Sequence, residues 1–402
     1  MKIKTNFKKA TVKSFVGGLT VLLSSSMLGV PAFAEPGVTD SEIDIGSCCA
    51  LTGPAAKLGL DQLAGANAYI SDVNAHGGVN GRKIVVKKYD DGYEPGKAVA
   101  AFNKLMADKC FAGAFFVGTP TAKVYVPLAE KNKVPIVGLF TGAPLLYEPF
   151  RKYVVSVRAS YADEMREQVD RMWKDLGPQK VGIIYQNDPF GQAVLDGLNK
   201  ALTAHNAQPV AKGTFERNTV DVNGAINQVK AANPDVVVLV GPYAPEAEIV
   251  KRAHAMGWKP LFTTVSFVGT EEFIQAAGKD AEEVVVTQVV APYNRDDLKT
   301  VSQYKKLLAQ YSPASKPNFC SFEGFVDAMV LVEGLKAAGK DLTREKLISA
   351  LESFHGKDLG LGPNLKLTYG PQRHKGLDSV YTTVVRDGQP VAFFNWKQVR
   401  SK

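Results

Sequence analysis

The residues of this 402-residue chain that could carry out covalent chemistry do not form a known catalytic arrangement. The sequence has no G-x-S-x-G elbow, no P-loop, no G-x-G-x-x-G and no H-E-x-x-H. The acid pair Asp90-Asp91 follows a predicted strand and is expected to cap a loop. The five histidines are scattered along the chain and are expected to be solvated or to cap helices and turns: His76, His205, His254, His355 and His374. We therefore expect no enzyme, no cofactor and no metal site.

The four cysteines do not suggest a metal or redox site either. Cys48, Cys49, Cys110 and Cys320 have the spacing of neither a zinc site nor a C-x-x-C pair. One disulfide is possible in an oxidising compartment. Because neighbouring Cys48 and Cys49 point to opposite faces of a strand, we favour buried free thiols.

Residues suited to binding a ligand stand instead at the ends of predicted strands. An apolar strand runs from Ile43 to Leu51, a helix with apolar positions at helical spacing follows, and Ile84–Tyr89 is a second strand. This strand–helix–strand unit is the building block of a parallel sheet. Ligands bind beyond the carboxyl ends of such strands, so the loop Cys49–Pro54 is placed to contact one.

The segment Gly118-Thr119-Pro120-Thr121 follows another strand and opens a helix. Free N–H groups at a helix start, together with threonine hydroxyls, suit a carboxylate. An ordinary N-cap at Thr119 or Thr121 explains the same residues equally well.

Further candidates follow later strands. Phe140-Thr141-Gly142 ends one strand of the first half of the chain. In the second half, Tyr161, Phe190 and Tyr243 could cover apolar ligand surface, although packing within a lobe would explain them too.

The amino-terminal segment 1–34 is typical of a secretory signal peptide. Five lysines precede or enter an apolar run, 15–30, and Ala32-Phe33-Ala34 is a small-x-small cleavage site. An uncleaved anchor is disfavoured, because the run is shorter than the ~20 residues of a membrane span. Removal of the segment lowers the formal net charge from +8 to +3, since it carries five lysines and no acid. The mature chain then gives no support for nucleic-acid binding and is expected to be soluble in the periplasm.

The order of predicted elements favours an α/β fold. Strands and helices alternate over 112–140 and again over 181–265, and the run VVVLV in 235–241 suits a parallel strand buried on both faces. The mature length suits two domains. We predict two Rossmann-like lobes with a ligand cleft between them.

The pattern "LTGPAAKLG … GANAYISDVNAHGGVNGRKI … YDDGYEP" resembles the periplasmic branched-chain amino-acid (leucine/isoleucine/valine) binding protein family, and the similarity continues to about Trp396. The resemblance implies a type I periplasmic binding fold with three crossovers between the lobes. It also implies a monomer that delivers a small ligand to an ABC permease in the inner membrane. A ligand-sensing subunit for a chemoreceptor or kinase would have the same fold. The predicted division is a signal peptide at 1–34, lobe 1 at 35–156 plus 287–362, and lobe 2 at 157–286 plus 363–402.

The resemblance also assigns roles to individual residues. Thr119 matches the family's serine that holds the ligand's α-carboxylate, and Phe190 and Tyr243 match family tyrosines. Gly142 stands where the family has a threonine, so that contact would pass to Thr141. The family's disulfide is absent, because Tyr93 and Gly118 replace its cysteines.

The most informative difference from the family is at Ser266. It occupies the position of the glutamate that neutralises the ligand's α-ammonium group. A desolvated ammonium without a partner costs several kcal/mol. Either another acid reaches the site, or the ligand is a carboxylate or amide, including an aromatic one, that lacks an α-amino group.

Overall fold

The computed structural model describes residues 1–11, 35–362 and 365–399. The apolar run and the cleavage site of the predicted signal peptide lie outside the described residues. Among the described residues, no helix has the length and apolar character that a membrane crossing requires. All of the elements below belong to the unit Glu35–Lys402.

The first lobe is built on a five-stranded parallel sheet with the order β2-β1-β3-β4-β5. Its central strands β3 and β4 are buried along their whole length, because helices cover both faces of the sheet. The strands are β1 (Glu42–Cys49), β2 (Lys83–Asp90), β3 (Ala112–Val117), β4 (Ile136–Phe140) and β5 (Val154–Val155).

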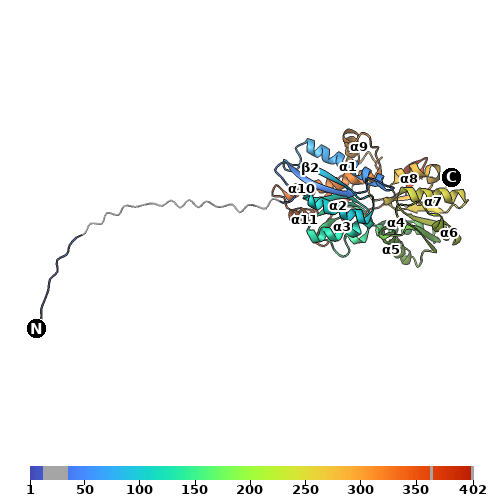
Figure 1. Ribbon diagram of the computed structural model, residues 1–402. Coiled ribbons are helices and arrows are strands. Elements are labelled where there is room, and N and C mark those ends of the chain that lie inside the picture. Colours follow the sequence, from blue (N-terminus) through green and yellow to red (C-terminus); the bar gives the residue numbers. More distant parts are fainter. Residues whose placement is uncertain (12–34, 363–364, 400–402) are drawn as a thin grey trace. The chain divides into compact units, whose positions relative to one another are not determined.

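In the described part of the chain, six α-helices belong to this lobe (Figure 1). They are α1 (Ala56–Ala75), α2 (Pro95–Ala107), α3 (Thr119–Asn132), α9 (Lys299–Tyr311), α10 (Phe319–Ala338) and α11 (Arg344–Glu352). Helix α2 packs on α3, while α1 packs on α9 and α10, and α10 also contacts β4. The short helix α11 was not predicted; it begins at the N-cap Thr343, whose side chain accepts a hydrogen bond from Lys346 N.

The second lobe has a seven-stranded sheet with the order β14-β13-β10-β9-β8-β6-β7. Five strands are parallel, and β13 and β14 add to one edge in antiparallel fashion. The strands are β6 (Val181–Gln186), β7 (Ala211–Phe215), β8 (Val236–Val240), β9 (Leu261–Thr264), β10 (Val285–Gln288), β13 (Tyr381–Arg386) and β14 (Gln389–Ala392). A small separate ribbon pairs β11 (Lys357–Asp358) with β12 (Lys366–Leu367).

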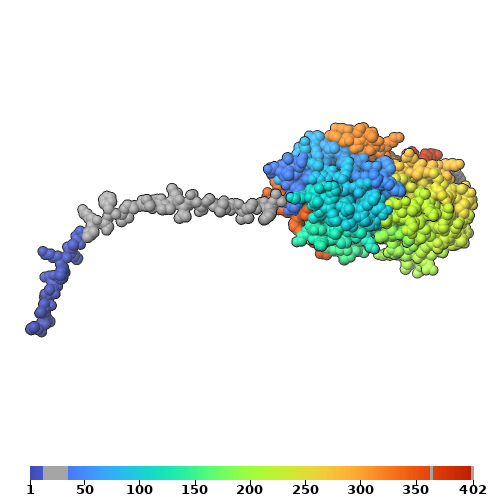
Figure 2. All heavy atoms as spheres, viewed as in Figure 1, coloured from blue at the N-terminus to red at the C-terminus, as the bar shows by residue number. Residues whose placement is uncertain are grey.

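The helices of the second lobe are α4 (Tyr161–Leu176), α5 (Pro189–Ala204), α6 (Asn223–Ala231), α7 (Tyr243–Ala255) and α8 (Thr270–Ala277). Helix α4 begins directly after Ser160, and a capping box between Ser160 and Asp163 explains this start. Figure 2 shows the blue-to-teal first lobe in contact with the green-to-yellow second lobe. The predicted α/β fold with two parallel-rich sheets is confirmed; the predicted lobe boundaries stay a prediction.

The expectations for the polar residues and cysteines hold except at His374. Asp90 caps the loop after β1 as predicted, because its carboxylate accepts from Leu51 N at 2.9 Å and from Thr52 Oγ at 2.6 Å. His374 is not solvated: it is 1 % exposed, and its Nε2 lies 3.1 Å from a carboxylate oxygen of Glu352. All four cysteines are buried free thiols, and burial raises the pKa of Cys49 to about 12.

Helices α1 and α10 approach each other at two glycines. A Cβ on Gly65 would lie 1.7 Å from the backbone oxygen of Ser321, and a Cβ on Gly324 would lie 2.0 Å from that of Gln62. Both neighbours are backbone atoms of a helix, so they cannot turn away. Close backbone contact of the two helices therefore depends on the missing side chains.

We predict that Gly324→Ala lowers the free energy of unfolding by about 1–3 kcal/mol, because the added methyl group forces α1 and α10 apart. Urea unfolding followed by circular dichroism measures the change. Gly96→Ala in the first turn of α2 is the control, since its added Cβ meets nothing within 4 Å. Equal stability of the two variants would contradict the tight crossing.

Candidate functional site

The carboxyl ends of the parallel strands in the two lobes face each other. Gln186 at the end of β6 donates from Nε2 to the Tyr93 hydroxyl, just after β2, at 3.2 Å. Arg217, after β7, lies 3.0 Å from the Glu94 carboxylate, and Asn218 donates to the same carboxylate at 2.5 Å. These contacts join the strand-end loops of one lobe to those of the other, where the sequence predicted the site.

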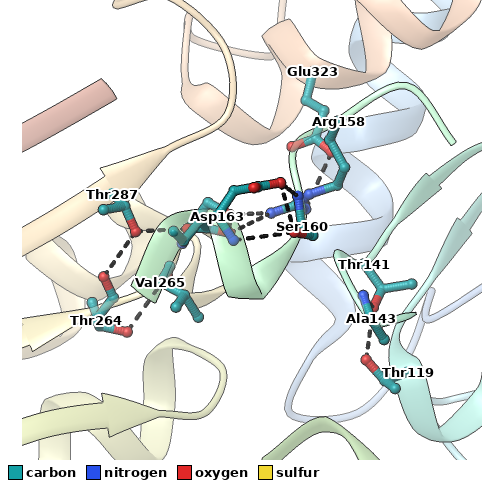
Figure 3. A network of polar contacts seen from close by, with 12 residues as sticks. Thr119, Thr141, Ala143, Arg158, Ser160, Asp163, Thr264, Val265, Thr287 and Glu323 are labelled. Atoms are coloured by element: carbon teal, nitrogen blue, oxygen red, sulfur yellow. Dashed lines mark hydrogen bonds and ion pairs between the residues drawn. The ribbon is translucent and has the colours of Figure 1, made fainter. Parts of the chain in front are cut away.

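Two of the predicted threonines lie together in the first lobe. The hydroxyl oxygens of Thr119 and Thr141 are 2.6 Å apart, and Ala143 N donates to Thr141 at 3.3 Å (Figure 3). Thr121 is used differently, because its hydroxyl donates to the backbone oxygen of Val117 at 2.6 Å. The N-cap of α3 is Gly118 without a side-chain hydrogen bond, so the N-cap interpretation of either threonine is wrong.

The absence of a side chain at Gly142 has a steric explanation. Its backbone oxygen accepts from Tyr161 N at 2.9 Å. A Cβ there would lie 2.7 Å from the same nitrogen. The glycine thus lets the loop after β4 contact the start of α4 directly.

Aromatic residues from both lobes meet in a buried group, which we call the ring cluster. Phe267 lies at its centre, with ring-centroid distances of 4.5 Å to Phe190, 5.6 Å to Phe140 and 5.9 Å to Tyr93. Tyr161 joins it through Phe190 at 5.3 Å. Phe140, Tyr161 and Phe190 were predicted as site residues, while Tyr93 and Phe267 were not.

Three of the predicted site residues have other surroundings and take no part in the ring cluster or in the pair of Thr119 and Thr141. Cys49 is buried in the first lobe, and its sulfur lies 3.6 Å from the Ser47 hydroxyl. Tyr243 is only partly buried and has no ring contact with the cluster; its ring lies beside Gly269. The hydroxyl of the third, Thr121, donates hydrogen bonds to backbone oxygens just before the start of its own helix.

A buried arginine, which sequence reasoning did not select, stands beside the ring cluster. Arg158 is 2 % exposed, and its guanidinium lies 3.2 Å from Glu323 of α10 and 3.3 Å from Glu164 of α4 (Figure 3). It also donates to the hydroxyl of Ser266. The guanidinium carbon is 5.2 Å from the ring centroid of Phe140 and 5.8 Å from that of Tyr161.

The carboxylate of Glu164, on helix α4, lies beside Ser266. Glu164 accepts hydrogen bonds from Ser266 N at 2.8 Å and Ser266 Oγ at 2.9 Å, and from Thr287 Oγ at 2.6 Å. Burial raises the pKa of Glu164, while the charge of Arg158 and these hydrogen bonds oppose the shift. An acid therefore does reach the site, but it is already paired with the cation of Arg158.

Two more carboxyl groups lie near Arg158 on α10. Burial raises the pKa of Glu323 to about 8; Arg158 opposes the shift, and the nearby Asp327 adds to it. Burial also raises the pKa of Asp327 to about 7, against the hydrogen bond from Gln62, 3.2 Å long. The pair therefore retains protons near neutral pH, which limits the negative charge around the single arginine.

A cavity of about 880 Å³ lies elsewhere, on the second lobe. Its lining includes Lys251, His254, Lys279, Glu282 and Arg386. It also includes Leu261 and Val284, which lie at the amino ends of β9 and β10. This is the edge opposite to the ring cluster, so we do not assign the ligand to it.

We predict that the free energy of unfolding falls as the pH rises from about 5 to 8. The folded-state pKa of Glu323 lies above its ordinary value, so the native state holds this proton more tightly than the unfolded state does. Its contribution is complete at acidic pH and is lost as the pH approaches 8. Glu323→Gln should flatten this slope in denaturant titrations, whereas Glu42→Gln on the exposed surface should leave it unchanged. An unchanged slope in Glu323→Gln would contradict the shift.

The comparisons with known proteins agree with this geometry. A family model described as "Periplasmic binding protein" matches residues 42–390. The chain is 25 % identical to the Leu/Ile/Val-binding protein of Escherichia coli K12 over 290 residues, which cover 71 % of this chain and 74 % of that protein. It is 27 % identical to an amino acid binding protein of Pseudomonas aeruginosa PAO1 over 66 % of this chain and 70 % of that one.

A solved structure extends the similarity to nearly the whole chain. It is the crystal structure of a possible leucine/isoleucine/valine-binding protein from Rhodopirellula baltica SH 1, which is 30 % identical. The match has a TM-score of 0.86 and covers 92 % of this chain and 100 % of that one. With a family model that spans 42–390, the chain belongs to the periplasmic binding protein family, the solute-binding proteins of ABC transporters, which are not enzymes.

Proposed function

We propose that this protein is secreted into the periplasm with a cleaved signal peptide, binds a small solute between its two lobes and delivers it to an ABC permease. The facing strand ends, the ring cluster and the hydrogen bonds between lobes support a cleft that closes on a ligand. Closure by hinge motion is the usual response of such two-lobed proteins to ligand. The permease would then bind the closed form.

We further propose that the ligand lacks an α-amino group. The observation that carries this is the pairing of Arg158 with Glu164 and Ser266. Glu164 and Ser266 would have to bind a ligand's ammonium group, and they already bind the guanidinium of Arg158, a cation that does not lose its proton. The hydroxyls of Thr119, at the start of α3, and of Thr141, directly after β4, suit the oxygens of a carboxylate or amide.

Two compounds that differ only in the amino group test this proposal. We expect 4-methylpentanoate, which is leucine without its amino group, to raise the melting temperature more than leucine does. Ligand at 100 times its dissociation constant adds about 2.7 kcal/mol of stability, so thermal-shift measurement will resolve the difference. Stronger stabilisation by leucine or valine would contradict the absence of an α-amino group, while the carrier function would stand.

We predict that contacts across the mouth of the cleft contribute to ligand affinity. Glu94→Gln removes the negative charge of the carboxylate that Arg217 and Asn218 contact, so the closed form loses an ion pair between the lobes. Because the pair is partly exposed, the expected loss of affinity is about 2- to 5-fold, and it should shrink at high salt. Glu248→Gln is the control, since its partner Arg252 lies on the same helix. Isothermal titration calorimetry measures both; an equal effect of the two substitutions would contradict a role in closure.

A further inference from the structure

We propose that the ligand of this cleft is an aromatic carboxylate whose ring takes the place of the Phe267 side chain in the ring cluster and whose carboxylate binds Arg158. This inference rests on the proposed function and names the ligand class of the same site. It has three grounds: the rings that surround Phe267, an unpaired donor on Arg158, and the charge balance around that arginine.

The ring cluster holds a flat aromatic ring that the chain itself supplies. Phe267 is fully buried, and it contacts Tyr93 and Phe140 of the first lobe and Phe190 of the second. The interplanar angles are 35°, 44° and 49°, so the three rings surround it in tilted contacts. Aromatic pairs at these separations gain about 0.5–1.5 kcal/mol beyond the burial of area. A ligand ring would regain this energy, whereas a branched aliphatic chain would not.

Phe267 can leave without disrupting the sheet. It lies on the short 3-10 turn Ser266–Val268, between the end of β9 at Thr264 and the start of α8 at Thr270. Among the described residues, the pairing of β9 with β8 and β10 ends at Thr264, before the turn. A ligand ring could therefore displace the side chain while β9 and α8 keep their places.

Arg158 has a donor for a carboxylate. Its Nε is buried and has no hydrogen-bond partner among the described residues, although the terminal nitrogens of the guanidinium reach Glu323, Glu164 and Ser266. A buried donor without an acceptor costs about 1–3 kcal/mol. The Tyr161 hydroxyl is also buried; among the described residues it lies near the Thr141 hydroxyl but makes no hydrogen bond of good geometry, so it is a second donor beside the same guanidinium. A carboxylate attached to a ring would satisfy both.

The charges around Arg158 permit a ligand anion. Glu164 balances the arginine, and Glu323 and Asp327 hold protons near neutral pH. A bound carboxylate would favour those protons further, so its affinity should fall as the pH rises through about 7 to 8.

Titration calorimetry with four probes on the mature chain tests the proposal: benzoate, cyclohexanecarboxylate, benzamide and leucine. We expect benzoate to bind about 2- to 10-fold more tightly than cyclohexanecarboxylate, which has the same charge and a similar size but no aromatic ring. Benzamide should bind more weakly than benzoate, because it lacks the negative charge that Arg158 attracts. Leucine should bind most weakly.

Two variants locate the contacts. Phe267→Ala should bind benzoate more tightly, because no side chain has to leave the ring cluster, while Phe394→Ala, at a side chain 80 % exposed, should bind it as the unsubstituted chain does. Arg158→Lys keeps the charge but removes the Nε donor, so it should lose affinity for benzoate. If Arg158→Lys does not fold, as judged by circular dichroism, Phe267→Ala and the four probes still decide the question.

The possible failures are distinguishable. Equal binding of the two ring acids, or weaker binding of benzoate to Phe267→Ala, would overturn the role given to the ring. Tight binding of leucine without binding of any aromatic acid would overturn the ligand class and leave the carrier function intact. If native mass spectrometry of protein from its host finds no solute, and a broad panel of small solutes finds no binding, the proposed function itself fails.

Discussion

The charge of Arg158 is the constraint on which the arrangement between the lobes depends. A guanidinium does not give up its proton in a protein, so its burial requires carboxylates and hydrogen-bond acceptors close by. Glu164 of the second lobe supplies the balancing charge, and Glu323 of the first lobe accepts a hydrogen bond from the same guanidinium at 3.2 Å. The guanidinium is thus contacted from both sides only when the lobes are together. If the lobes separated, water would replace one of these two contacts of Arg158. Pairing of the arginine and closure of the lobes are therefore linked.

Other features of the cleft follow from the same pairing. Ser266 is small and neutral, and it donates to Glu164 from both its backbone and its hydroxyl, which holds the carboxylate toward the arginine. An acid in its place would put a second negative charge beside Glu164. The rings of Phe140 and Tyr161 lie by the guanidinium, where their faces favour a cation. Gly142 lets the loop that follows Phe140 contact the start of the helix that carries Glu164.

Most of the fold was predictable because its signals are local. The apolar run of β8, and Ser160 with Asp163 at the start of α4, mark their elements within a few residues. The strand-end residues that meet in the site, such as Thr119 and Thr141, were predictable too, since parallel strands bring their carboxyl ends to one edge. The charged group formed by Arg158 and its carboxyl partners was not predictable. Glu164 has the sequence pattern of a solvated acid in the first turn of a helix. Arg158 and Ser266 are 108 positions apart in the sequence, so only the folded chain reveals that they are in contact.

The pairing also bears on how the site selects its ligand. A protein that binds amino acids can keep an unpaired acid in its cleft, because the ligand's ammonium arrives with the balancing charge. Here the balancing charge is part of the chain. An incoming ammonium would have to compete with the guanidinium of Arg158 for Glu164, or join it against the same acids. Both leave a desolvated cation without a full partner, at a cost of several kcal/mol. Under the proposed function, charge balance around Arg158, more than shape, would therefore select against an α-amino group.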